Sequence, residues 1–591
     1  MPEGEGKTPP KIAEKCPQIE ESKFRALFAK LRKRRIIETL AAFIGGGWLL
    51  IEVVERLLVS HYHFPERTID ITVVTLVAAL ICTLIWRWYS GREKLRKFKL
   101  EVVLIPLVVL VTVFLDINLL LHLKGPESET FPAAKWKNSI AVLPFDNISP
   151  EEGQDYFCDG LTDELITRLS KIKDLKVIAK TSAFSFKGKE IDIRDIGKKL
   201  NVATVLEGAV RKAGNKLRIT AQLINVANGF HLWSDSYDKE LIDVFAIQDE
   251  IALTIADKMK LTLLGEEKVK LTTRPTENLQ AYNLYLKGRY FWNKRGKDDN
   301  LKSIEYFNEA INKDPSYALG YSGMGMAYVT LGSNDFFPSK EVFPKAKAAA
   351  LKALEIDPSL DEAHVVLGAV LNWYERDFSG SENEFRRVIE LNPGNGDAHH
   401  WYAWLLLNLG RNKQAIKEML LARDLDPLAP RKNADVGSIF YYARDYPRAV
   451  EELKKSIELF PEHTGNYFRI ARVYCQTGEY KEAIESILPY AKQPEFGPTL
   501  AYAYAISGNK DKAQEILGNI LKNLSQQYFS PSYIAEVYIA LGDRKQALFW
   551  LEKAFSEFGY NLGRLKVDPE FDPLRSDPRF TELLRKTGLE K

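Results

Sequence analysis

Ser139-Ile-Ala-Val-Leu-Pro-Phe145 opens the segment around which the rest of the chain is organised. It is a short apolar run that ends at turn-forming residues, which is typical of a buried strand. Asp159–Leu169 follows with leucine and isoleucine at helical spacing and with acidic residues in its first turn, where the helix dipole favours them. A second strand is predicted at Leu175–Ala179 and a short helix at Asp192–Leu200.

The second half of this segment predicts paired strands. Two stretches of alternating polarity, Ala203–Lys212 and Lys216–Val226, are joined by a short turn that contains Gly-Asn, which is a hairpin signal. A further strand is predicted at Phe230–Tyr237 and a closing helix at Ile242–Met259. This order of strands and helices predicts an α/β (α+β) domain with a mixed sheet at 139–272.

Seven stretches of this domain resemble the TolB-amino-terminal-like (FlgO-like) domain of bacteria. They are Ser139–Phe145, Asp159–Glu164, Thr181–Gly188, Val205–Arg211, Ile219–Ile224, His231–Asp238 and Phe245–Glu250. The resemblance implies a domain that often precedes tetratricopeptide repeats in bacterial membrane proteins. It also implies a kinship with proteins named adenylate cyclases, in which a separate cyclase domain performs the reaction. The resemblance indicates an architecture more than an activity.

The carboxyl-terminal half repeats itself with the period of tetratricopeptide repeats. Prolines recur in steps of about 34 residues, at Asp357-Pro358, Asn392-Pro393, Asp426-Pro427 and Phe460-Pro461. A glycine followed five positions later by an alanine recurs at Gly410/Ala415, Gly478/Ala483, Gly508/Ala513 and Gly542/Ala547. The glycine permits a tight turn between two helices, and the alanine permits their close packing. We predict an all-α tetratricopeptide superhelix of about eight units at 278–558, followed by a C-terminal cap at 559–591.

Three apolar runs before these domains predict three transmembrane α-helices, at 36–59, 68–88 and 100–123. Each is close to the ~20 residues that cross a bilayer. Basic residues gather in the tail 1–35 and in the loop after the second run, which the positive-inside rule places in the cytoplasm. The expected location is the bacterial cytoplasmic (inner) membrane, with a polar linker at 124–138 and extracytoplasmic C-terminal domains. If the third run only lies on the membrane surface, those domains are cytoplasmic instead.

No sequence motif predicts catalysis. The chain has no GxxxxGK[ST], no GxGxxG between a strand and a helix, no HExxH and no GxSxG. A cyclase domain would need about 180 further residues with paired metal-binding carboxylates. The cysteines Cys16, Cys82, Cys158 and Cys475 are far apart, which argues against structural zinc or a disulfide framework. We predict no catalytic residue, no cofactor and no metal.

Several polar groups are interpreted as structural. Asp159, Asp163 and Glu164 form an acidic cluster at a predicted helix start, where capping explains them. The neighbours His399 and His400 point to different faces of a helix and make a poor metal chelate. The net charge of +3 gives no general attraction for nucleic acid, so no nucleic-acid partner is expected.

The sequence favours a membrane-anchored, non-catalytic scaffold or interaction protein. Its protein or peptide partners would bind the groove of the repeats and the TolB-like domain, and its helices would contact the lipid bilayer. The candidate partner-binding residues are Tyr282, Tyr285, Tyr290, Trp292, Trp401 and Tyr402. The alternative is an envelope sensor or regulator coupled to a separate cytoplasmic signalling enzyme such as an adenylate cyclase. An enzyme active in the α/β domain itself is the least favoured reading.

Overall fold

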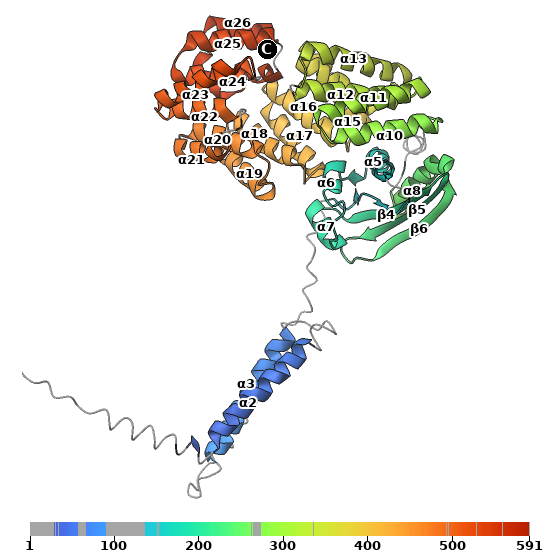
Figure 1. The fold of residues 1–591 in the computed structure, drawn as a ribbon, viewed down its shortest axis with the longest axis vertical. Coiled ribbons are helices and arrows are strands. Elements are labelled where there is room, and N and C mark those ends of the chain that lie inside the picture. The colour runs from blue at the N-terminus through green and yellow to red at the C-terminus, as the bar shows by residue number, and fades with distance from the viewer. Residues whose placement is uncertain are drawn as a thin grey trace, which may run out of the picture. The chain divides into compact units, whose positions relative to one another are not determined.

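The computed structural model forms two compact units, Met1–Phe131 and Pro132–Lys591 (Figure 1). The residues that it describes are 29, 31–32, 35–56, 67–89, 136–150, 153–261, 263, 274–334, 336–491, 493, 496–526, 529–557 and 560–589.

The first unit contains two helices that pack against each other, α2 (Ile36–Val53) and α3 (Arg67–Tyr89). Gly47 of α2 faces Leu76 of α3, and a Cβ added there would lie 3.7 Å from the Leu76 side chain, an ordinary van der Waals contact. The outer face of α2 is strongly apolar: Ile44 is 71% exposed, Trp48 73% and Leu49 66%.

Three membrane spans are predicted from the sequence, and this number is wrong for the residues that the structure describes. One helix there, Ile36–Arg56, is long and apolar enough to cross a membrane. A shorter apolar helix, Thr75–Ile85, lies within α3. The third predicted run, 100–123, lies outside the described residues.

The second unit begins with a mixed sheet in the order β3-β1-β4-β5-β6, with β2 beside β4. Strand β1 runs parallel to β3 and β4, whereas β5 is antiparallel to β4 and β6. The strands are β1 (Ser139–Val142), β2 (Asp146–Asn147), β3 (Lys176–Val177), β4 (Thr204–Ala213), β5 (Lys216–Asn225) and β6 (His231–Glu240). The predicted hairpin is confirmed: Ala213 pairs with Lys216 across a two-residue turn, in which Gly214 has φ +57°.

Helices cover both faces of the sheet. They are α5 (Asp155–Ser170), α6 (Lys180–Phe184), α7 (Ile193–Leu200), η2 (Leu241–Asp243) and α8 (Val244–Lys258). Alternate residues of each strand point to opposite faces. Under α5 and α8 lie Ile140, Val142, Leu206, Val210, Leu217 and Ile219. Under α7 lie Ala141, Leu143, Val205 and Val226.

The tetratricopeptide array follows as eight consecutive helix pairs, green to red in Figure 1. The pairs are α10 (Leu279–Asn293) with α11 (Lys297–Lys313), α12 (Ala318–Ser333) with α13 (Ser339–Ile356), α14 (Asp361–Val370) with α15 (Phe378–Leu391), α16 (Gly396–Asn408) with α17 (Asn412–Leu425), α18 (Pro430–Tyr442) with α19 (Tyr446–Leu459), α20 (Gly465–Thr477) with α21 (Tyr480–Ile487), α22 (Gly497–Ile506) with α23 (Lys510–Asn523), and α24 (Pro531–Leu541) with α25 (Arg544–Ser556). Two short turns, η3 (Leu371–Glu375) and η4 (Leu488–Tyr490), follow α14 and α21.

The glycine–alanine pattern works as predicted. Gly410, Gly478, Gly508 and Gly542 have φ between +80° and +93°, a left-handed conformation that glycine adopts without strain. The alanines five positions later are fully buried between the paired helices. In three other units an arginine takes the turn position with positive φ: Arg295, Arg376 and Arg444.

We predict opposite effects for alanine at two glycines of the array. Gly518 lies inside α23 with nothing within 4 Å of an added Cβ, so Gly518→Ala stabilises that repeat by about 0.5–1 kcal/mol. Gly542 has φ +89°, so Gly542→Ala destabilises by about 1–2 kcal/mol. Hydrogen exchange of α23–α25 in the full chain measures both. Equal effects would contradict the role assigned to the turn glycine.

The sheet domain and the first repeat share one hydrophobic core. Tyr282 and Tyr285 of α10 are buried in it, and the Tyr282 ring lies 4.7 Å from that of Phe245 on α8. Further along the array, the backbone N–H of Ala179 donates to the carbonyl of Leu425 at 2.8 Å. The repeats therefore hold the sheet domain at several points.

The chain ends with η6 (Tyr560–Arg564), η7 (Pro569–Leu574) and α26 (Pro578–Lys586). This C-terminal segment returns to the middle of the array: the Tyr441 hydroxyl of α18 donates to Glu570 at 3.1 Å, and Arg444 forms an ion pair with Asp572. It contacts both the last repeats and α18, so it closes part of the inner face of the superhelix.

Candidate functional site

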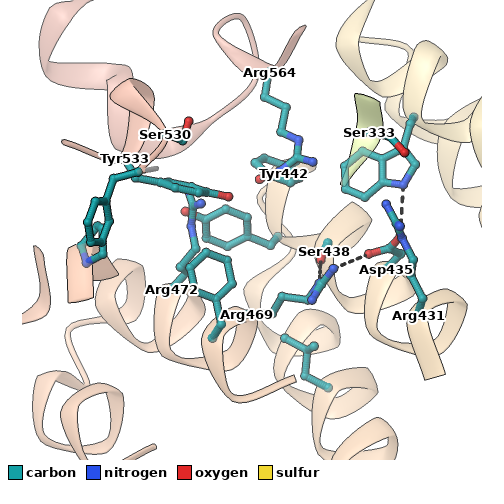
Figure 2. Close-up of a pocket in the computed structure, with 16 residues that line it drawn as sticks. Ser333, Arg431, Asp435, Ser438, Tyr442, Arg469, Arg472, Ser530, Tyr533 and Arg564 are labelled. Carbon is teal, nitrogen blue, oxygen red and sulfur yellow. Dashed lines mark hydrogen bonds and ion pairs between the residues drawn. The ribbon is translucent and has the colours of Figure 1, made fainter. Parts of the chain in front are cut away.

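A pocket of about 320 Å³ opens on the inner face of the array (Figure 2). Its walls come mainly from the first helix of each of five consecutive repeats, α16, α18, α20, α22 and α24, and from η6 of the C-terminal segment. The lining residues are Ser333, Trp404, Arg431, Asp435, Ser438, Tyr441, Tyr442, Leu453, Phe468, Arg469, Arg472, Pro498, Phe529, Ser530, Tyr533 and Arg564.

Four arginines and one carboxylate line this pocket. The carboxylate is Asp435, which accepts a hydrogen bond from Arg469 at 2.9 Å and lies 3.8 Å from Arg431. Burial alone would raise the pKa of Asp435, but Arg469 and His400 hold it well below its usual value. Burial lowers the pKa of His400, against the opposing effect of Asp435. The pocket therefore carries excess positive charge.

Packing fixes the direction of the guanidinium groups. Arg469 donates to the hydroxyl of Ser438 at 3.0 Å. Arg564 donates to the hydroxyl of Tyr442 at 3.1 Å and lies 4.7 Å from the ring centre of Trp404. In Figure 2, Arg564 enters from above, opposite Arg469 and Asp435. Stacked and hydrogen-bonded arginines lose little further freedom when a ligand binds.

The fourth arginine is neutralised behind the pocket. Arg472 lies 2.9 Å from Asp568, 2.9 Å from Glu570 and 3.4 Å from Glu536. All four side chains are 7% exposed or less. This cluster ties α20 to α24 and to η7, and it leaves the positive charge at the pocket mouth to Arg431, Arg469 and Arg564.

The cluster predicts a pH-dependent stability. Burial and the neighbouring Glu570 raise the pKa of Glu536 well above its usual value, against the opposing effect of Arg472. The folded protein thus binds this proton more tightly than the unfolded chain, so stability falls as pH rises from about 4.3 through the folded pKa. Glu536→Gln keeps the neutral shape and removes the part of this dependence that Glu536 contributes.

We expect Glu536→Gln to exceed the wild type in stability at alkaline pH by about 1 kcal/mol or more, since one unit of pKa shift is about 1.4 kcal/mol. Denaturant unfolding followed at a series of pH values measures the difference. Glu552→Gln is the matched control, because the side chain of Glu552 is 49% exposed in its pair with Arg579. A pH profile that Glu536→Gln leaves unchanged would contradict the assignment of the proton.

Aromatic rings form the remaining walls of the pocket. Phe468 and Tyr533 meet edge to face with ring centres 5.8 Å apart, and Tyr441 and Tyr442 do so at 4.9 Å. A cationic interior with aromatic walls suits a ligand that combines an anionic group with an apolar one. Among the described residues, no group of three His, Cys, Asp or Glu side chains could hold a metal ion.

Four of the six aromatic residues predicted to bind partners are buried. Tyr282 and Tyr285 lie under the sheet domain, where the first repeat must bury its apolar face. The Trp292 indole donates to Thr330 at 3.0 Å, and the Tyr402 hydroxyl donates to Glu382 at 3.0 Å. These four residues are 8% exposed or less, so their side chains pack inside the fold.

The other two predicted anchors are half-buried and lie outside the pocket. Tyr290 is in ring contact with Phe291, and Lys294 lies 4.8 Å from its ring centre. Trp401 packs on Trp373 with ring centres 5.1 Å apart. The aromatic residues of the pocket itself come from later repeats.

The acidic cluster predicted to cap a helix does not do so. Helix α5 begins at Asp155, so Asp159, Asp163 and Glu164 lie in its interior, where they are buried. Asp159 pairs with Lys187, and Asp163 pairs with Lys180 and with Arg289 of the first repeat. The cluster serves the contact between the sheet domain and the array.

One sequence signal could have found the pocket. Asp435 and Arg469 are separated by one repeat period of 34 residues, so they occupy equivalent positions on neighbouring inner helices and meet. A charged residue at an inner position of two successive repeats indicates a lined groove. No such signal exists for Arg564, which reaches the pocket through the fold of the C-terminal segment.

Comparisons with known proteins identify both parts of the second unit. The family model "HilA/YgeH-like transcriptional regulator, second domain" matches residues 136–253, and two tetratricopeptide models match 384–417 and 437–498. The repeats are thereby confirmed. The α/β domain matches the HilA-like family in place of the predicted TolB-like (FlgO-like) one.

The curated relatives share only part of their length with this chain. "Putative adenylate cyclase 3" of Rhizobium meliloti is 35% identical over 250 residues, 42% of this chain and 43% of that protein. "Transcriptional regulator HilA" of Salmonella typhimurium is 22% identical over 297 residues, 49% of this chain and 51% of that protein. The chain thus spans about half the length of the curated relatives it matches.

Solved structures of repeat proteins also match parts of the chain. YrrB, described as a TPR protein with an unusual peptide-binding site, is 23% identical with a TM-score of 0.23 and covers 32% of this chain and 92% of its own. Pseudomonas aeruginosa PilF is 21% identical with a TM-score of 0.29 and covers 38% of this chain and 98% of its own. By the family models, this chain combines a HilA-like α/β domain at 136–253 with tetratricopeptide repeats.

Proposed function

We propose that this chain is a membrane-anchored, non-catalytic interaction protein that holds a segment of a partner protein on the inner face of its repeats. The observation that carries the proposal is the pocket between α16, α18, α20, α24 and η6, with three arginines directed into a partly aromatic cavity. Stacked repeats generally use their concave face for binding. The cavity volume of about 320 Å³ accommodates one or two side chains of a peptide.

Peptide selection on the full chain in lipid nanodiscs tests this proposal. Peptides from a display library that bind the chain are examined by hydrogen exchange. We expect protection of α18, α20 and η6, and loss of binding when Tyr533→Ala and Tyr442→Ala remove two walls of the pocket. The proposal would be overturned if the selected peptides protected only the sheet domain. It would also be overturned if the chain bound nucleic acid and no peptide in the same assay.

The anchor that we propose is α2. It presents Ile44, Trp48 and Leu49 outward, and the helix Ile36–Arg56 has the length and apolarity of a membrane span. The basic cluster Lys30–Arg35 before it would stay in the cytoplasm. An odd number of crossings would then place the repeats outside the cytoplasm.

Membrane fractionation and a reporter fusion test the anchor. We expect the chain to stay with the vesicles after salt and alkaline carbonate washes, and a phosphatase fused after Lys591 to be active. Release of the intact chain by salt would end the anchoring proposal. An inactive phosphatase combined with an active cytoplasmic reporter would place the repeats in the cytoplasm.

We also propose that this chain catalyses no reaction. The Cys158 thiol is not activated as a nucleophile: it is buried, and burial followed by the nearby Asp159 raises its pKa to about 12. The name of the Rhizobium meliloti relative favours a second candidate, a regulator coupled to a separate adenylate cyclase. The purified chain would then form no cyclic AMP from ATP and magnesium, while its deletion would change cyclic AMP levels in the cell.

A further inference from the structure

We propose that the pocket is a subsite for a carboxylate side chain of the partner, carried on a peptide that also presents an aromatic residue to the neighbouring rings. The inference rests on the proposed function, because it names the chemistry of the segment held on the inner face of the repeats.

Arginines outnumber carboxylates among the residues that line the pocket. Arg431, Arg469 and Arg564 converge there, and Asp435 is the one carboxylate among the lining residues. Arg472 is already matched by the carboxylates behind it. A planar guanidinium fork pairs with a carboxylate through two parallel hydrogen bonds. An acidic side chain in the pocket would therefore replace water around arginines that the protein has already oriented.

The chain itself supplies an example of the ligand. The segment Asp568-Pro-Glu-Phe571 crosses the inner face directly behind the pocket. There Asp568 and Glu570 pair with Arg472, and Glu570 accepts a hydrogen bond from Tyr441. Phe571 is 2% exposed beside these pairs. An acidic segment with an aromatic residue thus already fits this surface, and Tyr441 lines the open pocket as well.

The buried carboxylate of Asp435 favours a carboxylate ligand over a phosphate. Three arginines share the pocket mouth with Asp435, and Asp435 bonds directly to Arg469 at 2.9 Å. A phosphate group with a charge near −2 would lie beside this buried carboxylate and be repelled by it. A singly charged carboxylate balances the arginines with less repulsion. The walls formed by Phe468 and Tyr533 then take the aromatic residue of the same peptide.

Fluorescence polarisation with defined peptides tests the assignment on the full chain in nanodiscs. The probe is a labelled peptide with the core Asp-Glu-Phe-Glu between glycines. Three comparison peptides differ from the probe: one has Asn and Gln in place of the acidic residues, one has Ala in place of Phe, and one has phosphoserine in place of one acidic residue. We expect the amide peptide to bind at least about tenfold more weakly, the alanine peptide several-fold more weakly, and binding of the acidic peptide to fall between about 50 mM and about 500 mM salt.

Matched variants locate the site. The side chain of Arg431 is 56% exposed, so Arg431→Gln leaves the fold intact and should weaken the acidic peptide about tenfold. Arg431→Lys should recover part of the loss. The control is Arg387→Gln on α15, where the arginine is 49% exposed in a surface pair. This variant should bind the acidic peptide with the affinity of the wild type.

Three results would overturn the assignment. The first is equal binding of the acidic and amide peptides. The second is that Arg431→Gln binds the acidic peptide as tightly as the wild type does. The third is a phosphoserine peptide that binds more tightly than the acidic one. If selected peptides protect α18 and α20 without any need for an acidic residue, this inference fails while the proposed function stands. If no peptide protects these helices, the proposed function fails first.

Discussion

Arg472→Met should lower the free energy of unfolding of the C-terminal repeats by about 3–5 kcal/mol, the usual cost of leaving buried partners of an ion pair without their counter-charge. Arg472 is 4% exposed and is the cation that Asp568, Glu570 and Glu536 share. Methionine fills similar space but leaves three carboxyl groups in a water-poor site. The elevated pKa values of Glu536 and Glu570 already show how costly their charges are there.

Hydrogen exchange of the full chain measures this loss, and we expect faster exchange in η7, α20 and α24 together. The control is Arg444→Met, which breaks an ion pair with Asp572 whose side chains are 39% and 43% exposed, so its cost should not exceed about 1 kcal/mol. Equal effects of the two substitutions would show that the cluster does not hold the C-terminal segment.

A compensating variant separates charge from packing. Adding Glu536→Gln and Glu570→Gln to Arg472→Met removes two of the groups that lose their partner. If desolvated charge causes the instability, this triple variant should recover most of the lost stability, since replacing a buried ion cluster by neutral groups is often tolerated. Failure to recover any stability would point to the shape of the arginine as the essential feature.

The fold was predictable where local chemistry and long-range packing agree. The hairpin between β4 and β5 follows from a Gly-Asn turn between alternating strands, and the repeats follow from Gly410 and its equivalents. Strand β2 and helix α6 were missed because two and five residues carry no usable periodicity. The units with Arg376 and Arg444 at the turn show that packing can impose a left-handed conformation on a residue other than glycine.

The site was harder to predict, because burial in a repeat array depends on neighbours that sequence spacing does not reveal. Tyr282 and Tyr285 looked like groove anchors, yet the sheet domain covers them. Arg564 reaches the pocket from a segment that lies beyond the last repeat and contacts Trp404 and Tyr442 far back in the chain. Asp163 was interpreted as a capping residue, because nothing in the sequence indicates that Arg289 lies beside it.

The contact between Arg289 and Asp163 leads to a second prediction with a large expected effect. Arg289 of α10 donates to Asp163 of α5 at 2.9 Å and to Glu362 of α14 at 2.6 Å. Its side chain is 15% exposed. It therefore joins the sheet domain to two repeats at once. Arg289→Leu should destabilise this junction by about 3–5 kcal/mol, because Asp163 and Glu362 remain buried or nearly so and lose their shared partner.

The expected signature of Arg289→Leu is a loss of coupling between the sheet domain and the repeats. Hydrogen exchange should increase in α5 and α10 while α20–α25 stay unchanged, and one thermal transition of the wild type should separate into two. Arg218→Leu is the control, since Arg218 pairs with Asp238 on the open surface of the sheet with side chains 53% and 62% exposed. An exchange pattern that is the same for both variants would contradict the assigned role.

Acid should reveal the same contact in the wild type. Burial on its own would raise the pKa of Asp163, but Arg289 and Lys180 hold it below its usual value. A depressed carboxyl pKa stabilises the fold above the unfolded value of about 3.9, and this contribution disappears as pH falls through the folded pKa. Wild-type α5 and α10 should therefore lose protection on acidification more steeply than the same helices in Arg289→Leu, where the strongest partner of Asp163 is already gone. An equally steep acid response in both proteins would show that Lys180 alone sets the charge of Asp163.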